Sequence, residues 1–299
     1  MQPLYRANGK LLITGEYAVL LGAEALAIPT RFGQTLAVEN HERNKLLWTA
    51  LDHRSQVWFK AEFDRHLNII SSTDESAALY LKKLIQTALQ LGKLPFPTSL
   101  HLKTSLDFPN NWGLGSSSTL ISLIAQWSGI DAMTLFKETS TGSGYDVACA
   151  TADHPIIYTL TEAGARWERK DLPPAFDEVL FVHLNQKQRS APEVSRFKAS
   201  ADFDRSELVQ QVSALTQRFL NVSSATELSR LIDEHEALLS PVLKLPTLNE
   251  RLFPDFEGSV KSLGAWGGDF IMALGPNAHS YFRSKGFTTC FSLKEIALH

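Results

Sequence analysis

The stretch NNWGLGSSSTL at positions 110–120 contains the residue types that a protein uses to bind phosphate. Gly113 and Gly115 allow backbone conformations that other residues rarely adopt, and they let a ligand approach the main chain closely. The hydroxyl residues 116–119 can cap the start of a helix, where outward N–H groups and the helix dipole favour an anion. A plain glycine-containing loop with a serine cap would look the same, because Gly-x-Gly followed by serines is common. The choice between these interpretations depends on the rest of the chain.

Local patterns place this loop between a strand and a helix. The segment TSLHLKTSLDF at 98–108 is predicted to be extended and leads directly into the loop. The apolar run at 120–127, directly after the loop, predicts a helix. Strand, glycine-rich loop and helix in this order would present a helix N-terminus to a phosphate.

The remaining patterns mix helices and strands, which indicates the α+β class. A strand is predicted at 26–38 with breaks at Pro29 and Gly33, and a helix at 76–94 with its stop at Gly92. Further strands are predicted at 11–14, 55–64, 178–184 and 270–274, a hairpin at 156–160 and 166–172, and further helices at 131–138, 206–220, 224–239 and 259–263.

Length and composition bound the class of protein. The 299 residues suffice for two domains, and Pro173 with Pro174 predicts a boundary between 1–172 and 173–299. Hydrophobic residues make up 44% and charged residues 20%, as in a globular protein, and the net charge of −3 disfavours a nucleic-acid partner. Without a membrane-spanning apolar run or room for a signal peptide, we expect a cytoplasmic protein. The two cysteines predict neither a disulfide framework nor a zinc site.

Three glycine-rich turns of similar character occur along the chain: NGKLLITGEYAVLLG at 8–22, NWGLGSSST at 111–119 and LGAWGGDF at 263–270. Their order and spacing resemble the three motifs of the GHMP kinases, the superfamily of galactokinase, homoserine kinase, mevalonate kinase and phosphomevalonate kinase. The segment GSGYDVACA at 142–150 resembles the one that carries the catalytic aspartate in mevalonate and phosphomevalonate kinases. The resemblance covers nearly the whole chain.

The resemblance implies a two-domain α+β GHMP kinase fold. Residues 1–172 would form an ATP-binding domain like ribosomal protein S5 domain 2, and residues 173–299 a ferredoxin-like domain. It also implies ATP and Mg²⁺ as cofactors and a small-molecule acceptor as the partner. No nucleic-acid or membrane partner is expected, and monomer and homodimer both stay open.

The resemblance assigns roles around the phosphoryl group. Asp146 would be the catalytic base, although without the resemblance it would be interpreted as a helix cap. Lys10 would lie beside it, keep the carboxylate ionised and contact the moving phosphate, with a solvated turn residue as the alternative. Ser117 would help to hold Mg²⁺, and Glu138 is either a second metal ligand or a solvated carboxylate at a helix end. The residues expected to wrap the ATP phosphates are Gly113, Leu114, Gly115, Ser116, Ser117 and Ser118.

On the acceptor side, Glu16 and Tyr17 match a Glu-His pair of the first motif, with packing at a strand end as the alternative. Lys187 and Arg189 lie in a loop that would recognise a charged end of the acceptor, or that is only solvated. Glycines of the third turn would support the phosphate loop or the acceptor: Gly264, Gly267 and Gly268. The chain departs from the family pattern at Asn8, Ser118, Trp266 and Asp269.

The segments GSGYDVA and GKLLITGEYAVL are most similar to the mevalonate branch. The predicted function is therefore transfer of the γ-phosphoryl group of ATP to mevalonate or phosphomevalonate, in the synthesis of isoprenoid precursors. A diphosphomevalonate decarboxylase, another sugar or amino-acid kinase of the superfamily, and a non-catalytic metabolite sensor stay open. A sensor would be expected to lack Lys10, Ser117 or Asp146, and all three are present. A Rossmann dinucleotide site is disfavoured because the loop lacks the third glycine.

Overall fold

The chain is divided between two compact units in a computed structural model that describes residues 3–186, 194, 197, 202–264, 266 and 268–298. Unit 1 consists of Met1–Gly9, Phe32–Asn110 and Leu114–Thr151. Unit 2 consists of Lys10–Arg31, Asn111–Gly113 and Ala152–His299. Each unit is therefore assembled from separate parts of the chain, and a single domain boundary after residue 172 stays a prediction.

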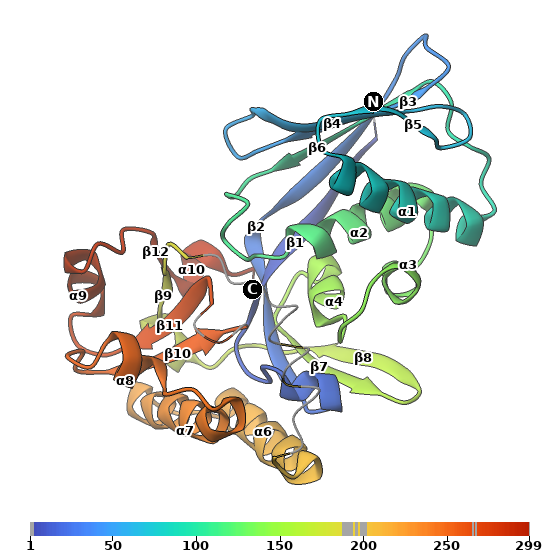
Figure 1. Ribbon diagram of the computed structural model, residues 1–299. Helices are drawn as coiled ribbons and strands as arrows, with labels where there is room; N and C mark the ends of the chain where they lie inside the picture. The colour runs from blue at the N-terminus through green and yellow to red at the C-terminus, as the bar shows by residue number, and fades with distance from the viewer. Residues whose placement is uncertain are drawn as a thin grey trace. The chain divides into compact units, whose positions relative to one another are not determined.

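Unit 1 is built on a mixed sheet with the strand order β5-β4-β3-β6-β2. Strands β3 and β6 are parallel, and the other neighbours are antiparallel. In Figure 1, helices α1 and α2 lie on one side of this sheet. The elements are the first part of β1 (Leu4–Leu12), the second part of β2 (Ala25–Asn40), β3 (Leu46–Leu51), β4 (Val57–Phe63), β5 (Ile69–Ser72), α1 (Glu75–Gly92), β6 (Leu100–Leu106), α2 (Ser116–Ser128), α3 (Ala132–Thr139) and α4 (Tyr145–Thr151).

Alternating burial along the strands creates one apolar and one polar face of the unit 1 sheet. In β4, Phe59, Ala61 and Phe63 are buried, whereas Lys60 between them is exposed. This is the period of two that strand geometry imposes, and it confirms the strand predicted from the alternation at 55–64. The polar face carries a groove that crosses β3, β4, β5 and β6.

Strand β2 is continuous, whereas the sequence predicted breaks at Pro29 and Gly33. Pro29, which has no N–H group to donate, lies between the part of β2 that pairs with β7, up to Ala27, and the part that pairs with β6, from Gln34. Strand β1 also pairs with β2. Gly33 is needed for a close approach, since a Cβ atom at this position would lie 2.3 Å from the carbonyl oxygen of Ala7. These two residues therefore fit the strand instead of ending it.

Helix α1 confirms the helix predicted at 76–94, but its stop differs in detail. Asp74 caps its start by accepting a hydrogen bond of 3.0 Å from the N–H group of Ala77. At the other end, Gly92 is the last helical residue, and Lys93 takes the left-handed conformation with φ 50°. The helix therefore ends at Gly92 as predicted, but the left-handed position that follows is taken by Lys93 instead of a glycine.

Unit 2 contains an antiparallel four-stranded sheet with the order β10-β11-β9-β12. A hairpin of β7 and β8 pairs with the beginning of β2, as predicted for a hairpin in this region. Helices α6 and α7 pack against each other, and α7 also packs against β10. The elements are η1 (Ala18–Leu21), β7 (Ile156–Thr161), β8 (Gly164–Arg169), η2 (Pro174–Glu178), β9 (Leu180–His183), α6 (Arg205–Leu220), α7 (Ala225–Leu243), α8 (Leu248–Leu252), β10 (Ser259–Leu263), β11 (Phe270–Leu274), α9 (Ala278–Ser284), β12 (Cys290–Ser292) and α10 (Leu293–Ile296).

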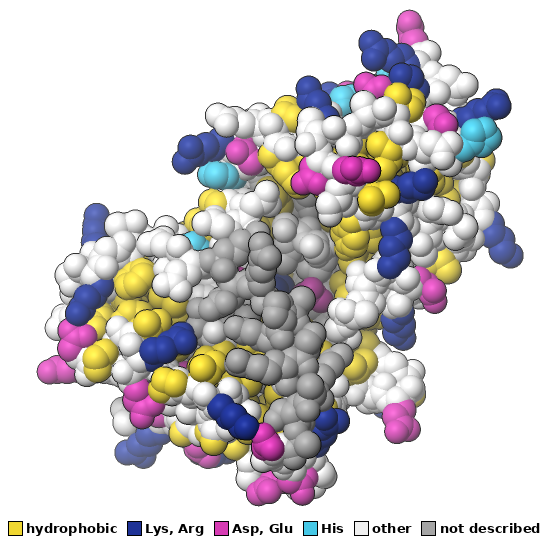
Figure 2. Space-filling model, viewed as in Figure 1, with side chains coloured by type: hydrophobic (Ala, Val, Ile, Leu, Met, Phe, Trp, Pro, Cys, Tyr) yellow, Lys and Arg dark blue, Asp and Glu magenta, His cyan; other side chains and the backbone are white. Residues whose placement is uncertain are grey.

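The two sheets and their helices confirm the predicted α+β class. The residues predicted as a helix at 259–263 instead form strand β10. Basic and acidic side chains are interspersed on the face of the molecule drawn in Figure 2. Within the described part of the chain, no helix combines the length and the hydropathy needed to span a bilayer.

Candidate active site

The start of α2 in unit 1 combines a left-handed glycine with helix N–H groups that no side chain caps. Strand β6 ends at Leu106, and α2 begins at Ser116 after Gly115, which is its N-cap residue with φ 88°. Among the described residues, no side chain accepts a capping hydrogen bond from this helix start. The first-turn N–H groups and the positive end of the helix dipole are the features that an anion would use.

The hydroxyl residues of the loop divide into two kinds. Ser118 and Thr119 are buried and stabilise the loop internally, because Ser118 Oγ donates to the carbonyl oxygen of Gly115 over 2.8 Å. Thr119 Oγ1 donates to Gln34 Oε1 over 2.7 Å. Ser116 is partly exposed and Ser117 is exposed, so the Ser117 hydroxyl is the most accessible of the four.

The preceding residues 111–113 belong to unit 2, where they are held by its strands. Lys10 Nζ donates to the carbonyl oxygen of Gly113 over 2.8 Å. Trp112 makes ring contacts with His183, Phe270 and Phe291. These contacts anchor the first half of the loop to β9, β11 and β12.

Gly113 also contacts the third glycine-rich turn. Its φ is 64°, and a Cβ atom at this position would lie 1.8 Å from Asp269 Oδ2. A side chain larger than hydrogen would therefore displace the Asp269 carboxylate. Asp269 is one of the departures from the family pattern, and the structure places it against Gly113 within unit 2.

Asp146 lies in the first turn of α4 in unit 1 and is partly buried. Its Oδ1 atom accepts a hydrogen bond of 3.1 Å from the N–H group of Val147. The pKa of Tyr80 on α1 is raised mainly by burial, and the Asp146 charge adds to this shift. Lys10 belongs to unit 2, so the expected proximity of Lys10 and Asp146 stays a prediction.

Glu16 is part of a buried charge cluster in unit 2, which consists of Glu16, His235, Glu236 and Lys261. All four side chains are almost completely inaccessible to solvent. Glu16 Oε1 accepts a hydrogen bond from Lys261 Nζ, and Glu16 Oε2 lies 3.3 Å from His235 Nε2. Glu236 accepts a hydrogen bond of 3.0 Å from the N–H group of Ser262. The carboxylate of Glu16 is thus engaged inside unit 2, as in the packing alternative for this residue.

Burial controls the protonation of the buried charge cluster. It raises the pKa of Glu16 to about 7, although the nearby Lys261 ammonium acts in the opposite direction. Burial also raises the pKa of Glu236, and it lowers the pKa of His235 well below its ordinary value, with the Lys261 charge adding to the effect. Near neutral pH, a neutral His235 therefore lies beside a carboxyl group that is close to its titration point.

Three members of this cluster were not predicted from the sequence, namely His235, Glu236 and Lys261. Lys261 stands in the middle of the otherwise uncharged strand segment SVKSL, and all five residues of this strand are buried. A lysine within such an otherwise uncharged segment was the signal that could have indicated a buried ion pair, because a buried ammonium requires a partner. The sequence did not indicate that the partner was Glu16.

Tyr17 is buried, and its hydroxyl accepts a hydrogen bond of 2.9 Å from the N–H group of Trp266 in the third turn. Gly268 is buried, and Glu138 is exposed on α3. Lys187, Arg189 and Gly267 lie outside the described residues. Within the described ranges, no group of three or more His, Cys, Asp or Glu side chains is arranged to hold a metal ion.

No protein-family model matches the sequence, and no curated protein matches it. Solved structures of GHMP kinases, in contrast, superpose on nearly the whole chain, so the predicted GHMP kinase fold is confirmed. Mevalonate kinase from Methanococcus jannaschii has a TM-score of 0.73 at 14% identity, covering 100% of this chain and 99% of its own.

Two further structural neighbours were solved in complex with ligands. Galactokinase from Lactococcus lactis, complexed with galactose, has a TM-score of 0.71 at 14% identity, with coverage of 99% and 93%. Phosphomevalonate kinase from Streptococcus pneumoniae, in complex with phosphomevalonate and AMPPNP, has a TM-score of 0.68 at 16% identity, with coverage of 97% and 99%. Because these identities are low and the acceptors differ, the comparison defines the fold and not the acceptor.

Proposed function

We propose that this protein is an ATP-dependent kinase that phosphorylates mevalonate or phosphomevalonate. The observation that carries the proposal is the start of α2, where a left-handed Gly115 and uncapped N–H groups follow strand β6 in a fold shared with GHMP kinases. Such a helix start favours phosphate oxygens. The segment GSGYDVA at 142–148 supports the mevalonate branch over the other acceptors.

In this proposal, the nucleotide is bound by the loop residues 113–118. Phosphoryl transfer depends mainly on positioning and on neutralisation of charge. The exposed hydroxyl of Ser117 at the helix start fits a Mg²⁺ ion that is held chiefly by phosphate oxygens and water, and Glu138 is the proposed second ligand. When bound, Mg²⁺ would supply neutralisation of the negative charge on the transferred phosphoryl group.

The chain's own groups would handle the proton and the acceptor. Asp146 would accept or orient the proton of the acceptor hydroxyl, and Lys10 would keep that carboxylate ionised. Lys187 and Arg189 would bind a charged end of the acceptor, while Gly268 would support the third turn. The remaining proposed residues of the acceptor side are Glu16, Tyr17 and Gly267.

Because Glu16 and Tyr17 are buried, their contribution would be to position the first motif and the third turn. The hydrogen bond between the Tyr17 hydroxyl and the N–H group of Trp266 joins these two segments. A change at either residue should therefore act on acceptor binding through the conformation of the third turn.

The proposal is tested by measuring ADP release from ATP with mevalonate, phosphomevalonate, diphosphomevalonate, homoserine and galactose as separate acceptors. We expect stimulation by mevalonate or phosphomevalonate. Release of carbon dioxide with diphosphomevalonate would identify a decarboxylase instead. Stimulation by galactose or homoserine would show that the acceptor is not mevalonate or phosphomevalonate. Nucleotide binding without ADP release for every acceptor would support a sensor and contradict the proposed kinase.

Two variants with matched controls test the residues. Asp146→Asn should lower kcat by about 10²–10⁴-fold, as loss of a general base does, while Asp153→Asn, an exposed aspartate, should not. Ser117→Ala should lower turnover, while Ser76→Ala, an exposed serine in the first turn of α1, should not. Unchanged activity of Asp146→Asn would remove this residue from the proposed mechanism.

A further inference from the structure

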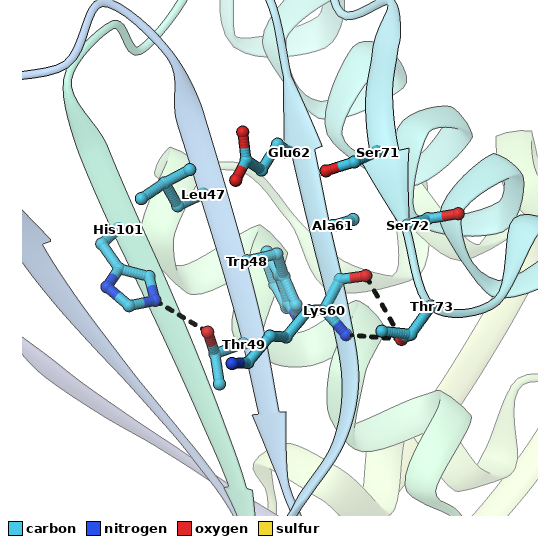
Figure 3. Close-up of a pocket in the computed structure, with 10 residues that line it drawn as sticks. All are labelled: Leu47, Trp48, Thr49, Lys60, Ala61, Glu62, Ser71, Ser72, Thr73 and His101. Atoms are coloured by element: carbon cyan, nitrogen blue, oxygen red, sulfur yellow. Dashed lines mark hydrogen bonds between the residues drawn. The ribbon is translucent and has the colours of Figure 1, made fainter.

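The polar face of the unit 1 sheet has a groove with a volume of about 380 Å³. The groove crosses β3, β4, β5 and β6, all of which belong to unit 1. Figure 3 shows the side chains that line it, with Thr49, Lys60 and His101 contributed by three different strands. The proposed kinase mechanism uses none of these residues.

Three hydrogen-bonding groups converge in this groove. Thr49 on β3 lies directly opposite Lys60 on β4 in the antiparallel register. His101 on the other neighbour of β3 has its Nε2 atom 2.8 Å from Thr49 Oγ1. In Figure 3, the Lys60 side chain extends across β3 toward Thr49. A hydroxyl, an ammonium and an imidazole are therefore presented together.

The carboxylates around the groove are already paired with other cations. Glu62 forms an ion pair of 3.1 Å with Lys45, and Glu39 forms one of 2.7 Å with Lys103. Within the described residues, the ammonium of Lys60 has no ion-pair partner. The groove consequently carries an uncompensated positive charge.

The positive charges around the groove also affect the pKa of the His101 imidazole. Its pKa is lowered first by burial and next by the charge of Lys103, and His41 and Lys60 act in the same direction. Only Glu39 opposes them. An imidazole surrounded in this way is stabilised in its neutral form, and an anion entering the groove would oppose the contribution of the neighbouring positive charges.

We propose that this groove is a second ligand site, which binds a small molecule carrying a phosphate group. The ammonium of Lys60 pairs with one phosphate oxygen, and the Thr49 hydroxyl donates to another. His101 supports this arrangement when its Nε2–H group donates to Thr49 Oγ1, because the hydroxyl proton is then directed to the ligand. The side chain of Leu47, beside His101 in Figure 3, offers an apolar contact to the organic part.

The experiment follows the His101 ring by NMR in the full-length protein. The resonance is assigned by its loss in His101→Gln, and its pKa is measured in inorganic phosphate and in sodium chloride of equal ionic strength. We expect phosphate to raise the pKa of His101 more than chloride does, because a bound anion stabilises the imidazolium. An equal rise in both salts means screening alone and overturns the proposal.

Variants test whether the difference between phosphate and chloride arises in the groove. Lys60→Met should abolish the difference between phosphate and chloride, and Lys137→Met, which removes an exposed lysine of α3, should retain it. Ser117→Ala should also retain it, so a loss there would assign the effect to the phosphate loop and refute a second site. Glycerol phosphate should act like inorganic phosphate. An equal response to acetate would overturn the assignment to phosphate.

Discussion

Removal of the Lys261 ammonium tests the buried charge cluster most directly. Lys261 and Glu16 are both inaccessible to solvent, and the ammonium also donates to the carbonyl oxygen of Ser262 over 2.9 Å. In Lys261→Met, the apolar part of the side chain is retained, but the Glu16 carboxylate loses its cation. Breaking one side of a buried ion pair costs about 3–5 kcal/mol. We expect a loss of stability of this size.

A second substitution can separate the cost of breaking the ion pair from general damage to the strand. In the double variant Glu16→Gln with Lys261→Met, the uncompensated charge of Glu16 is removed, and Glu236 keeps its hydrogen bonds from the N–H groups of Leu248 and Ser262. Replacement of a whole buried pair by neutral residues is often without cost. We therefore expect the double variant to regain about 2 kcal/mol or more relative to Lys261→Met.

The assay is urea unfolding near pH 7.5, followed by tryptophan fluorescence, to which the buried Trp266 of unit 2 contributes. Each transition is fitted separately, because a chain with two compact units need not unfold in one step. If the double variant is as unstable as Lys261→Met within about 0.5 kcal/mol, the two side chains are not coupled. That result would refute the reasoning on the ion pair.

Two further outcomes are expected for unit 2. The pKa of Glu16 rises from 4.5 to about 7 on folding, so the folded state binds this proton more tightly than the unfolded state. The stability that this proton contributes is fully present below about pH 4.5 and is lost as the pH rises toward 7. Between about pH 5 and pH 8, the wild type should lose about 2–3 kcal/mol more stability than Glu16→Gln; parallel pH profiles in urea unfolding would contradict this. Gly113→Ala should destabilise the fold by about 1–3 kcal/mol, because the new Cβ atom would overlap Asp269. Adding Asp269→Gly should restore most of that loss in the same assay, and absence of rescue would show that this contact is not the cause.

The parts of the fold that depend on neighbouring residues were predictable. The order of β6, the glycine-rich loop and α2 follows from signals within about twenty residues, namely the extended segment, two glycines and the apolar run. The same holds for α3, whose start is capped by Asp131. Short-range chemistry also located the candidate phosphate loop.

Features that depend on distant residues were not predictable in this way. Gly33 was interpreted as a strand break, but its role depends on the approach of Ala7 from another strand. The segment SVKSL was assigned to a helix, although it pairs with β11 inside a sheet. A short run without clear periodicity does not distinguish the two.

The candidate site shows the same division. The candidate phosphate loop and Asp146 were proposed from local motifs, whereas the contact between Asp269 and Gly113 requires the tertiary fold. The internal roles of Ser118 and Thr119 could not be separated from that of Ser117 by residue type, because all three carry the same functional group. Only their burial distinguishes them.

The pairing of Glu16 with Lys261 has a consequence for the synthesis of the protein. The two residues are 245 positions apart, so Glu16 leaves the ribosome long before its partner is translated. At about 5–20 residues per second, the cation follows about 12–50 s later. Throughout this interval the nascent chain carries an unmatched carboxylate that water must solvate, and the cluster in unit 2 can form only after Lys261 has been translated.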